Sequence, residues 1–267
     1  MKLTGRSKND LKRIQAALKA EGFDPGPIDG KNGPRTDQAA TAWETERAGW
    51  ARGIDISSYQ PRVDWATVAK DGVSWMLARA SVSVYKDALC DDHIKAAKAA
   101  GLLVGAYHFF APWRSPEEQA KIFLAQVKGL PIDLPLVTDV EALAPKAKEG
   151  EPAPIPVTTA QLVERTAAFM AIVEKETGRR PTLYTYSAFS TQHKLGVAFG
   201  ATHRLHIADY REGPPTVSAG WGRYAFHQHA GDNGRQAGVL LPKGKLSPCD
   251  LNVYRGSLEQ LKLFCQG

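Results

Sequence analysis

The sequence predicts an α/β protein in which an irregular (β/α) barrel of the TIM type follows a small all-α N-terminal domain. The chain has 267 residues, which suits one large domain together with a small one. After residue 53, strand-like and helix-like patterns alternate repeatedly, whereas the first fifty residues show helical spacing alone. Hydrophobic residues make up 43% of the chain and charged residues 23%, a balance that excludes a disordered or fibrous protein.

Residues 1–50 form the first predicted domain. Apolar residues at helical spacing predict one helix that starts at Asn9–Asp10 and a second over about 34–43, with a turn-rich stretch between them. Two short helices bury only a marginal core, so we expect this unit to dock on, or be tethered to, something larger. The boundary is predicted at 49–52, and so short a linker should hold the two units near each other.

Residues 53–267 form the second predicted domain. Eight segments are expected to be strands, namely 54–57, 75–80, 103–110, 134–141, 182–187, 205–210, 224–229 and 251–254. Helices are expected at 65–70, 92–100, 116–127 and 159–176. This alternation predicts parallel strands, joined by right-handed crossovers, that close into a barrel. The last three strands lack full helices between them, so we expect an irregular second half, and 144–156 should be a loop.

A pair of acidic residues closes the fourth predicted strand, which ends Thr138-Asp139-Val140-Glu141. Because side chains alternate along a strand, Asp139 and Glu141 should both point into the barrel at its C-terminal rim, where barrel enzymes act. Each carboxylate should raise the pKa of the other, and burial should raise both pKa values further. The alternative is an ordinary ion pair with Arg79 on the second strand.

Two further acids are expected at the same rim, Asp55 on the first strand and Asp250 at the start of the last strand. Such a cluster suits cleavage of a glycosidic bond. One protonated acid donates its proton to the leaving oxygen, and an ionised acid stabilises or attacks the developing cation. We expect Glu141 to be the proton donor because it lies at the strand end and has the longer reach. Asp139 is then the expected ionised partner.

Aromatic residues follow the same rim and offer flat surfaces on which sugar rings stack. The candidates for substrate contact are Tyr107, Tyr184, Tyr186 and Tyr210. The neighbouring polar residues Asp209 and Gln228 complete the set of expected substrate-binding residues. Phe109 and Phe110, by contrast, suit plain packing of the barrel.

The N-terminal unit resembles the peptidoglycan-binding domain 1 family. The residues that carry this resemblance are Leu11, Ile14-Gln15, Leu18, Gly22-Phe23, Ile28-Asp29-Gly30, Gly33-Pro34, Thr36 and Ala39-Ala40. Where that family has Phe-Gln in its last helix, this chain has Trp43-Glu44, which keeps the aromatic core residue and changes the polar contact. The resemblance implies a module that binds the bacterial cell wall; a helical hairpin without a ligand is the alternative.

From Gly53 to about Phe264 the chain resembles the glycoside hydrolase family 25 muramidases. Six motifs carry this resemblance, namely G-I-D-I-S-S-Y-Q (53–60), G-A-Y-H-F-F (105–110), T-D-V-E (138–141), L-Y-T-Y (183–186), I-A-D-Y (207–210) and C-D-L-N (249–252). In that family the positions that match Asp55, Asp139, Glu141 and Asp250 form the acidic cluster. The position that matches Glu141 is the general acid, which donates the proton.

The resemblance implies hydrolysis of the β-1,4 bond between N-acetylmuramic acid and N-acetylglucosamine in peptidoglycan, with no metal or other cofactor. Several family members are thought to use the acetamido group of the substrate as the nucleophile, oriented by the residue that matches Asp139; direct attack by a carboxylate stays open. We expect a monomeric phage endolysin. The sequence departs from the family at His206 and at His227-Gln228-His229, where the family has tryptophan and W-Q-Y.

The charge and the termini bear on partners and location. The net charge of +6 is spread along the chain, which suits an anionic polymer, and the resemblance selects the cell wall rather than nucleic acid. No apolar run approaches the roughly 18 residues of a membrane helix, and Met1–Asp10 is not followed by a secretory h-region. We therefore expect no membrane anchor, and storage in the host cytoplasm until release to the wall.

Two other functions stay open. His203, His206, Asp209, His227 and His229 could ligate zinc in a wall amidase or peptidase, although no H-E-x-x-H motif is present. The chain could also be a wall-binding or tail protein without turnover. The three cysteines, Cys90, Cys249 and Cys265, are odd in number and widely spaced, which argues for reduced thiols rather than a disulfide framework or a zinc cage.

Overall fold

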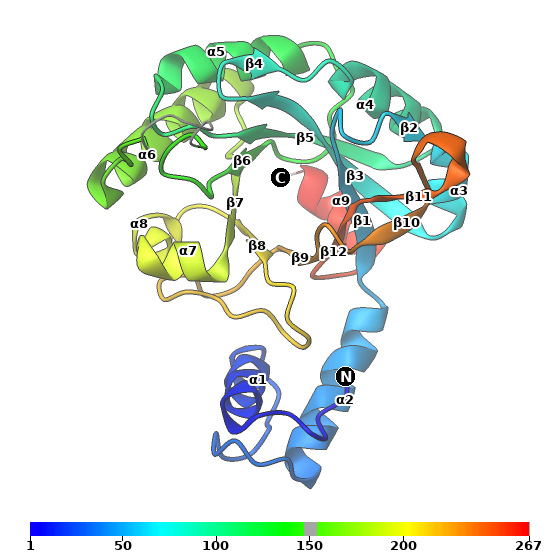
Figure 1. The fold of residues 1–267 in the computed structure, drawn as a ribbon, viewed down its shortest axis with the longest axis vertical. Helices are drawn as coiled ribbons and strands as arrows, with labels where there is room; N and C mark the ends of the chain where they lie inside the picture. The colour runs from blue at the N-terminus through cyan, green and yellow to red at the C-terminus, as the bar shows by residue number, and fades with distance from the viewer. Residues whose placement is uncertain (147–153, 267) are drawn as a thin grey trace.

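A computed structural model describes residues 1–146 and 154–266, and it contains a closed eight-stranded barrel with a small helical unit docked beside it (Figure 1). The barrel strands, in chain order, are β1 (Ala51–Ile56), β3 (Val73–Val82), β5 (Leu103–Phe109), β6 (Val137–Asp139), β7 (Thr182–Tyr186), β8 (Leu205–Ala208), β9 (Phe226–Ala230) and β12 (Asp250–Tyr254). These correspond to the eight predicted strands, so the predicted fold class is confirmed.

One expectation about strand direction is wrong. The strands from β1 to β9 pair in parallel around the barrel, but β12 runs antiparallel to both of its neighbours, β1 and β9. The cause is the connection that precedes it. No helix in the described residues carries the chain from the end of β9 back to the other rim, so the chain re-enters the sheet from the rim at which it left.

The segment 231–248, which precedes β12, forms a hairpin. Its strands β10 (Arg235–Leu240) and β11 (Leu246–Pro248) flank the short 3₁₀ turn Pro242–Gly244, and β10 also pairs with β2 (Arg62–Val63). The hairpin therefore builds a second, three-stranded sheet beside the barrel rim. Separately, the two-residue strand β4 (Tyr85–Lys86) pairs with the end of β3 in the barrel sheet.

The helices outside the barrel match the predicted alternation. They are α3 (Trp65–Lys70), α4 (Cys90–Ala99), α5 (Pro116–Val127), α6 (Thr159–Thr177), α7 (Ser187–Gln192), α8 (Leu195–Phe199) and α9 (Leu258–Gln266). Local sequence fixes their ends: Ser115 caps α5, and α6 has a capping box between Thr158 and Gln161. The second half is irregular, as expected, because α7 and α8 are short. Of the predicted loop 144–156, residues 147–153 lie outside the described residues.

The barrel interior is packed below the rim, which confines any cavity to the top. Trp75, Leu77 and Leu134 are buried inside the barrel. A Cβ on Gly53 would lie 2.1 Å from Cε2 of Trp75, so the indole can fill the barrel floor only because position 53 has no side chain. The Trp75 indole N–H donates to the Ala51 carbonyl at 3.0 Å, which satisfies the buried donor.

The N-terminal unit contains α1 (Lys8–Ala20) and α2 (Pro34–Ala48). Its core is apolar and consists of Leu3, Leu11, Ile14, Leu18, Ala39, Ala40 and Trp43. The helix cap differs from the prediction, because Ser7 rather than Asn9–Asp10 caps α1 by accepting from the Asp10 N–H at 3.1 Å. The helix begins at Lys8, which places Asn9 and Asp10 inside its first turn, and the Asp10 carboxylate accepts from Arg6 and Arg13.

The two units meet without a free linker. Helix α2 ends at Ala48 and β1 begins at Ala51, while Trp50 between them is buried in the barrel core. Barrel packing thus begins slightly before the predicted limit at residue 53. None of the helices in residues 1–146 and 154–266 combines the length and apolar character needed for a membrane span. Cys90, Cys249 and Cys265 are free thiols.

Candidate active site

A cavity of about 320 Å³ opens at the rim formed by the C-terminal ends of the parallel strands, and all four predicted acids line it. Asp55 lies near the end of β1, Asp139 ends β6, and Glu141 follows two residues later. Asp250 is the first residue of β12 and reaches the same rim because β12 runs in the opposite direction. The antiparallel register places Asp250 opposite Asp55.

The backbone beyond β6 keeps the alternation on which the prediction for Asp139 and Glu141 depended. Phe110 N–H donates to the Asp139 carbonyl at 2.9 Å, and Val140 N–H donates to the Tyr184 carbonyl at 2.9 Å. Val140 is fully buried on the outer side of the sheet, whereas Asp139 and Glu141 both line the cavity. The acid pair therefore shares one face, as predicted.

The alternative of an ion pair between Arg79 and these acids is wrong. Arg79 donates to Asp87 at 2.9 Å and to Ser58 at 3.1 Å. Among the described residues, no salt bridge joins Arg79 to Asp139 or Glu141. The guanidinium instead lies in the cavity wall, 5.0 Å from the ring centroid of Tyr59.

Burial controls the protonation of the acid pair. The pKa of Asp139 is raised well above its usual value, first by burial and then by the charges of Glu141, Asp55 and Asp250. Its Oδ1 atom is buried and has no hydrogen-bond partner among residues 1–146 and 154–266. The pKa of Glu141 is also raised by burial, which Lys146 partly offsets. Burial and mutual repulsion therefore favour a pair that shares a proton over a doubly ionised pair, and which of the two carboxyls is ionised stays a prediction.

The other two acids titrate at higher pH than free aspartic acid. Burial and then the charge of Asp250 raise the pKa of Asp55 to about 8. Burial, Asp232 and Glu141 raise the pKa of Asp250 to about 6. Burial and mutual repulsion therefore disfavour a cavity in which all four acids are ionised.

Gln228 on β9 connects the acids to the aromatic wall. Its side-chain carbonyl accepts from the hydroxyls of Tyr184, at 2.8 Å, and Tyr210, at 2.6 Å. Its amide nitrogen donates to Asp55 at 2.8 Å. The two hydroxyl donors fix which way the amide points, so the nitrogen is held toward the carboxyl. Gln228 is predicted as a substrate contact, and no sequence pattern indicates that it bridges Asp55 and the two tyrosines.

A second cavity of about 770 Å³ adjoins the first, and Glu141, Tyr184 and Tyr210 line both. Tyr186 is 39% exposed and opens onto the second cavity, while Tyr107 lines the first. The two cavities form a continuous groove with Glu141 at their junction.

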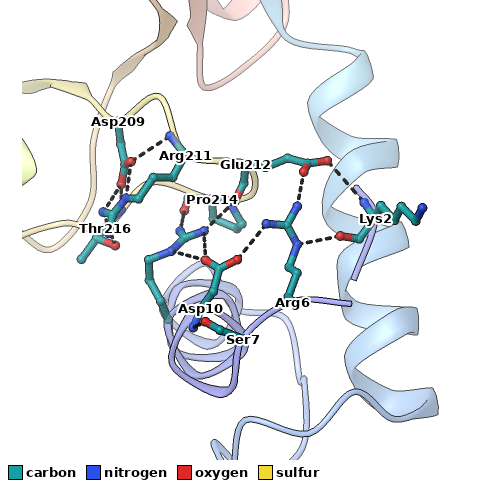
Figure 2. Close-up of polar contacts among 10 residues, drawn as sticks. Lys2, Arg6, Ser7, Asp10, Asp209, Arg211, Glu212, Pro214 and Thr216 are labelled. Carbon is teal, nitrogen blue, oxygen red and sulfur yellow. Dashed lines mark hydrogen bonds and ion pairs between the residues drawn. The ribbon is translucent and has the colours of Figure 1, made fainter. Parts of the chain in front are cut away.

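Asp209 also borders the second cavity, but its carboxylate is already hydrogen-bonded to other residues of the same loop. It accepts from the Arg211 guanidinium at 2.6 and 2.8 Å and from the Thr216 N–H at 3.0 Å, and only 3% of its side chain is exposed (Figure 2). This geometry shapes the loop between β8 and β9 rather than presenting an acid to a ligand.

The wall of the first cavity also contains residues that were not predicted as site residues, among them Tyr59 and Phe109. Tyr59 is 76% exposed beside Arg79, and Phe109 faces the cavity although it was expected to be packing. Tyr59 belongs to the G-I-D-I-S-S-Y-Q stretch, so its closeness to Asp55 in sequence was the available signal. The expectation for Phe110 is confirmed, because it is fully buried.

The histidines do not form a metal site. His206 pairs with Asn252 at 2.7 Å, and His227 donates to the Asp209 carbonyl at 2.9 Å. Burial lowers the pKa of His206 to about 3 and that of His227 to about 4. His203 precedes β8 rather than lying on it. No group of three or more His, Cys, Asp or Glu side chains in the described parts of the chain could hold a metal ion, so the zinc alternative lacks a ligand set.

Comparison with known proteins agrees with this geometry. The model of the family "Glycosyl hydrolases family 25" matches residues 54–239. The N,O-diacetylmuramidase of Arthroderma benhamiae is 30% identical over 236 residues, which cover 86% of this chain and 93% of that protein. Lysozyme M1 of Streptomyces globisporus is 28% identical over 241 residues, which cover 86% of this chain and 78% of that protein.

Solved structures place the fold in the same group. The bacterial lysozyme from Streptomyces coelicolor superposes with a TM-score of 0.69 at 26% sequence identity, covering 81% of this chain and 97% of that chain. The matched region begins at β1 and contains Asp55, Asp139 and Glu141. The chain belongs to glycosyl hydrolase family 25.

Proposed function

We propose that the protein is a lysozyme (N-acetylmuramidase) that hydrolyses the β-1,4 bond between N-acetylmuramic acid and N-acetylglucosamine in bacterial peptidoglycan. The observation that carries the proposal is the position of Glu141 where two adjoining cavities meet, with Asp139 on the same face. A saccharide chain that fills both cavities has one glycosidic oxygen at this junction. The similarity to a muramidase and a lysozyme supports this substrate.

Glu141 is the proposed general acid. It is the acid that lines both cavities, so it can reach an oxygen shared by two sugar rings. Its raised pKa keeps a proton available near neutral pH. The muramic acid residue lies in the acid-lined first cavity, where positive charge develops, and the leaving N-acetylglucosamine lies in the second.

Asp139 is the proposed partner, and its role depends on bound substrate. The orphan Oδ1 of Asp139 can accept a hydrogen bond from the acetamido N–H of the sugar. Such a bond lowers the pKa of Asp139, while the sugar buries Glu141 further and raises its pKa. The proton of the pair then sits on Glu141, and Asp139 orients the acetamido group as nucleophile. Direct attack by the Asp139 carboxylate is the alternative.

The remaining residues support the pair. Asp55 and Asp250 raise the pKa of Asp139 through their charges, and Gln228 holds Asp55 in place. Tyr107, Tyr184, Tyr186 and Tyr210 offer ring faces and hydroxyls to the sugars. Asp209 is assigned to the loop rather than to substrate, because its carboxylate is already bonded to Arg211 and Thr216.

The ends of the product chains test this proposal. Peptidoglycan digested by the protein is reduced with borohydride and examined by mass spectrometry. We expect muramitol at the new ends. Glucosaminitol, anhydro ends or free peptides contradict the proposal, and intact polymer that still binds the protein indicates a wall-binding protein without turnover.

The finer role is proposed as that of a phage endolysin whose N-terminal unit binds peptidoglycan, with the protein held in the host cytoplasm until it reaches the wall. The net charge of +6 supports attraction to an anionic wall. Co-sedimentation with purified walls tests the binding: substitutions on the exposed face of α2 should weaken it and leave cleavage of short fragments unchanged. Lysis from within is tested by expression with and without a membrane pore, and lysis that does not depend on the pore contradicts the role.

A further inference from the structure

The N-terminal unit contacts the connection between β8 and β9, and this connection also forms part of the groove. Arg6 forms an ion pair with Glu212, and the Lys2 N–H donates to the same carboxylate at 3.3 Å (Figure 2). Arg13 donates to the backbone carbonyls of Glu212, at 2.6 Å, and Pro214, at 3.4 Å. Two arginines of one unit thus hold Glu212 and Pro214 of the other, the two residues that flank Gly213.

Asp10 orients both arginines. Its carboxylate accepts from Arg6 at 2.7 Å and from Arg13 at 3.1 Å. The side chains of Arg6 and Arg13 are 19% and 12% exposed, so these ion pairs are better shielded from water than ordinary surface pairs. The two arginines are therefore oriented by contacts within the N-terminal unit as well as by the barrel.

The packing at this contact is close. Gly213 has a φ of +103°, a conformation that favours glycine, and a Cβ there would lie 2.9 Å from Sδ of Met1 and 3.5 Å from Ile14. At Gly213 the connection packs against the N-terminal unit with its backbone, because this residue has no side chain. The fit depends on the conformation of the loop as well as on its charges.

The other side of the same connection lines the groove. Tyr210, Arg211 and Thr216 border the second cavity, and Tyr210 bonds to Gln228 in the first. Asp209 ties Arg211 to Thr216, which closes the connection into a compact loop. Residues 212–214 thus lie only one or two positions along the chain from the residues of the groove wall.

A second anchor fixes the unit on the barrel. Glu21 accepts from Arg255 at 2.8 Å, and the Trp50 ring lies edge-on to both Trp43 and Tyr224 with centroids 6.3 Å apart. Two separate anchors prevent rotation about the short junction between α2 and β1. The unit therefore sits on the barrel as a fixed part, not as a module on a tether.

We propose that the N-terminal unit is a positioning element of the catalytic groove: through Arg6 and Arg13 it holds the 209–216 connection, and so the Tyr210–Arg211 wall that receives the leaving-group side of the saccharide chain. This inference rests on the proposed function for the identity of the saccharide. Arg6 and Arg13 are positioning residues that do not touch the substrate.

The experiment compares the full-length wild type with the double variant Arg6→Ala/Arg13→Ala. Arg35→Ala is the matched control, because Arg35 pairs with Asp24 inside the same unit. Hydrogen exchange of residues 209–216 is measured together with kcat and KM on soluble peptidoglycan fragments. We expect faster exchange in this segment and a KM raised about tenfold, with kcat changed less than about twofold, because the loop contributes binding rather than chemistry. The control should match the wild type in both measurements.

Unchanged exchange and unchanged KM in a folded double variant overturn the proposal. If the double variant does not fold, Glu212→Ala on the barrel side gives the same test, with Glu212→Gln expected to restore protection because its side chain still accepts from Arg6. The two proposals fail separately. A wild type that releases no muramic acid ends refutes the proposed function, whereas the exchange measurement still decides whether the N-terminal unit holds the loop.

Discussion

Asp55 and Asp250 lie opposite each other in the antiparallel register of β1 and β12, and the charge of Asp250 contributes to raising the pKa of Asp55 to about 8. Two acids from opposite ends of the barrel sequence thus meet on neighbouring strands. The arrangement depends on the reversed direction of β12, since a parallel last strand would carry its first residue to the far rim. The direction of β12 therefore brings Asp250 close enough for its charge to add to the effect of burial on the pKa of Asp55.

Glu141→Gln should lower turnover of peptidoglycan roughly a hundredfold or more, which is the scale of losing a general acid. The amide keeps the shape of the side chain but has no proton to give at this step, so binding to walls should persist. Release of reducing ends measures turnover, and co-sedimentation measures binding. Glu118→Gln on α5, exposed and outside both cavities, is the control and should retain full activity. A Glu141→Gln protein with wild-type turnover would remove the assignment of Glu141.

Asp250→Asn should lower the pKa of Asp55. Loss of the negative charge at position 250 makes the ionised form of Asp55 less unfavourable, so its titration should move below about 8. Carbon-13 NMR of labelled aspartate carboxyls follows this titration directly. Asp92→Asn, on the exposed side of α4, should leave it unchanged. An Asp55 titration that stays in place would show that burial alone sets the pKa.

The free energy of unfolding should fall as pH rises through the neutral range. The pKa of Asp55 is about 8 in the folded protein and near its ordinary value of 3.8 in the unfolded chain. A carboxyl with a raised folded pKa favours the folded state below the unfolded pKa, and this contribution is lost as pH rises toward the folded pKa. Denaturant unfolding between about pH 4 and pH 8 measures the slope. Asp55→Asn should flatten it, and an equal slope in both proteins would contradict the account.

Gln228→Leu should destabilise the protein by about 1–3 kcal/mol, because it leaves two tyrosine hydroxyls and the Asp55 carboxyl without their partner. It should also lower kcat, since Asp55 loses its fixed position. Gln236→Leu is a matched control: Gln236 is also buried but bonds to Asp71 outside the groove. The control should lose stability and keep kcat. Equal losses of kcat in the two variants would show that Gln228 is only structural.

Most of the fold could be predicted from local patterns in the sequence. Period-two and period-3.6 apolar spacing located the eight strands and the outer helices, and side-chain alternation put Asp139 and Glu141 on one face. Side chains continue to alternate between the two faces past the end of β6, because the Val140 N–H still donates to the neighbouring strand. These features depend on residues close together in sequence, which a sequence pattern records.

The features that were not predicted depend on contacts between distant residues. The direction of β12 follows from a connection that forms a hairpin instead of a helix. The bridge from Gln228 to Asp55 spans 173 positions, and the contact of Arg6 with Glu212 spans 206. The raised pKa of Asp139 likewise depends on its burial and on Asp55 and Asp250, which lie far from it in the sequence. No local spacing encodes these relationships.

The central claim is that a glycosidic oxygen sits between the two cavities beside Glu141, with the acetamido group of the sugar facing Asp139. A crystal structure of Glu141→Gln with a bound peptidoglycan tetrasaccharide measures this directly. The account predicts that oxygen about 3 Å from the side chain at position 141 and the acetamido nitrogen within hydrogen-bond distance of Asp139 Oδ1. A saccharide bound elsewhere, or one whose glycosidic oxygens all lie away from position 141, would contradict it.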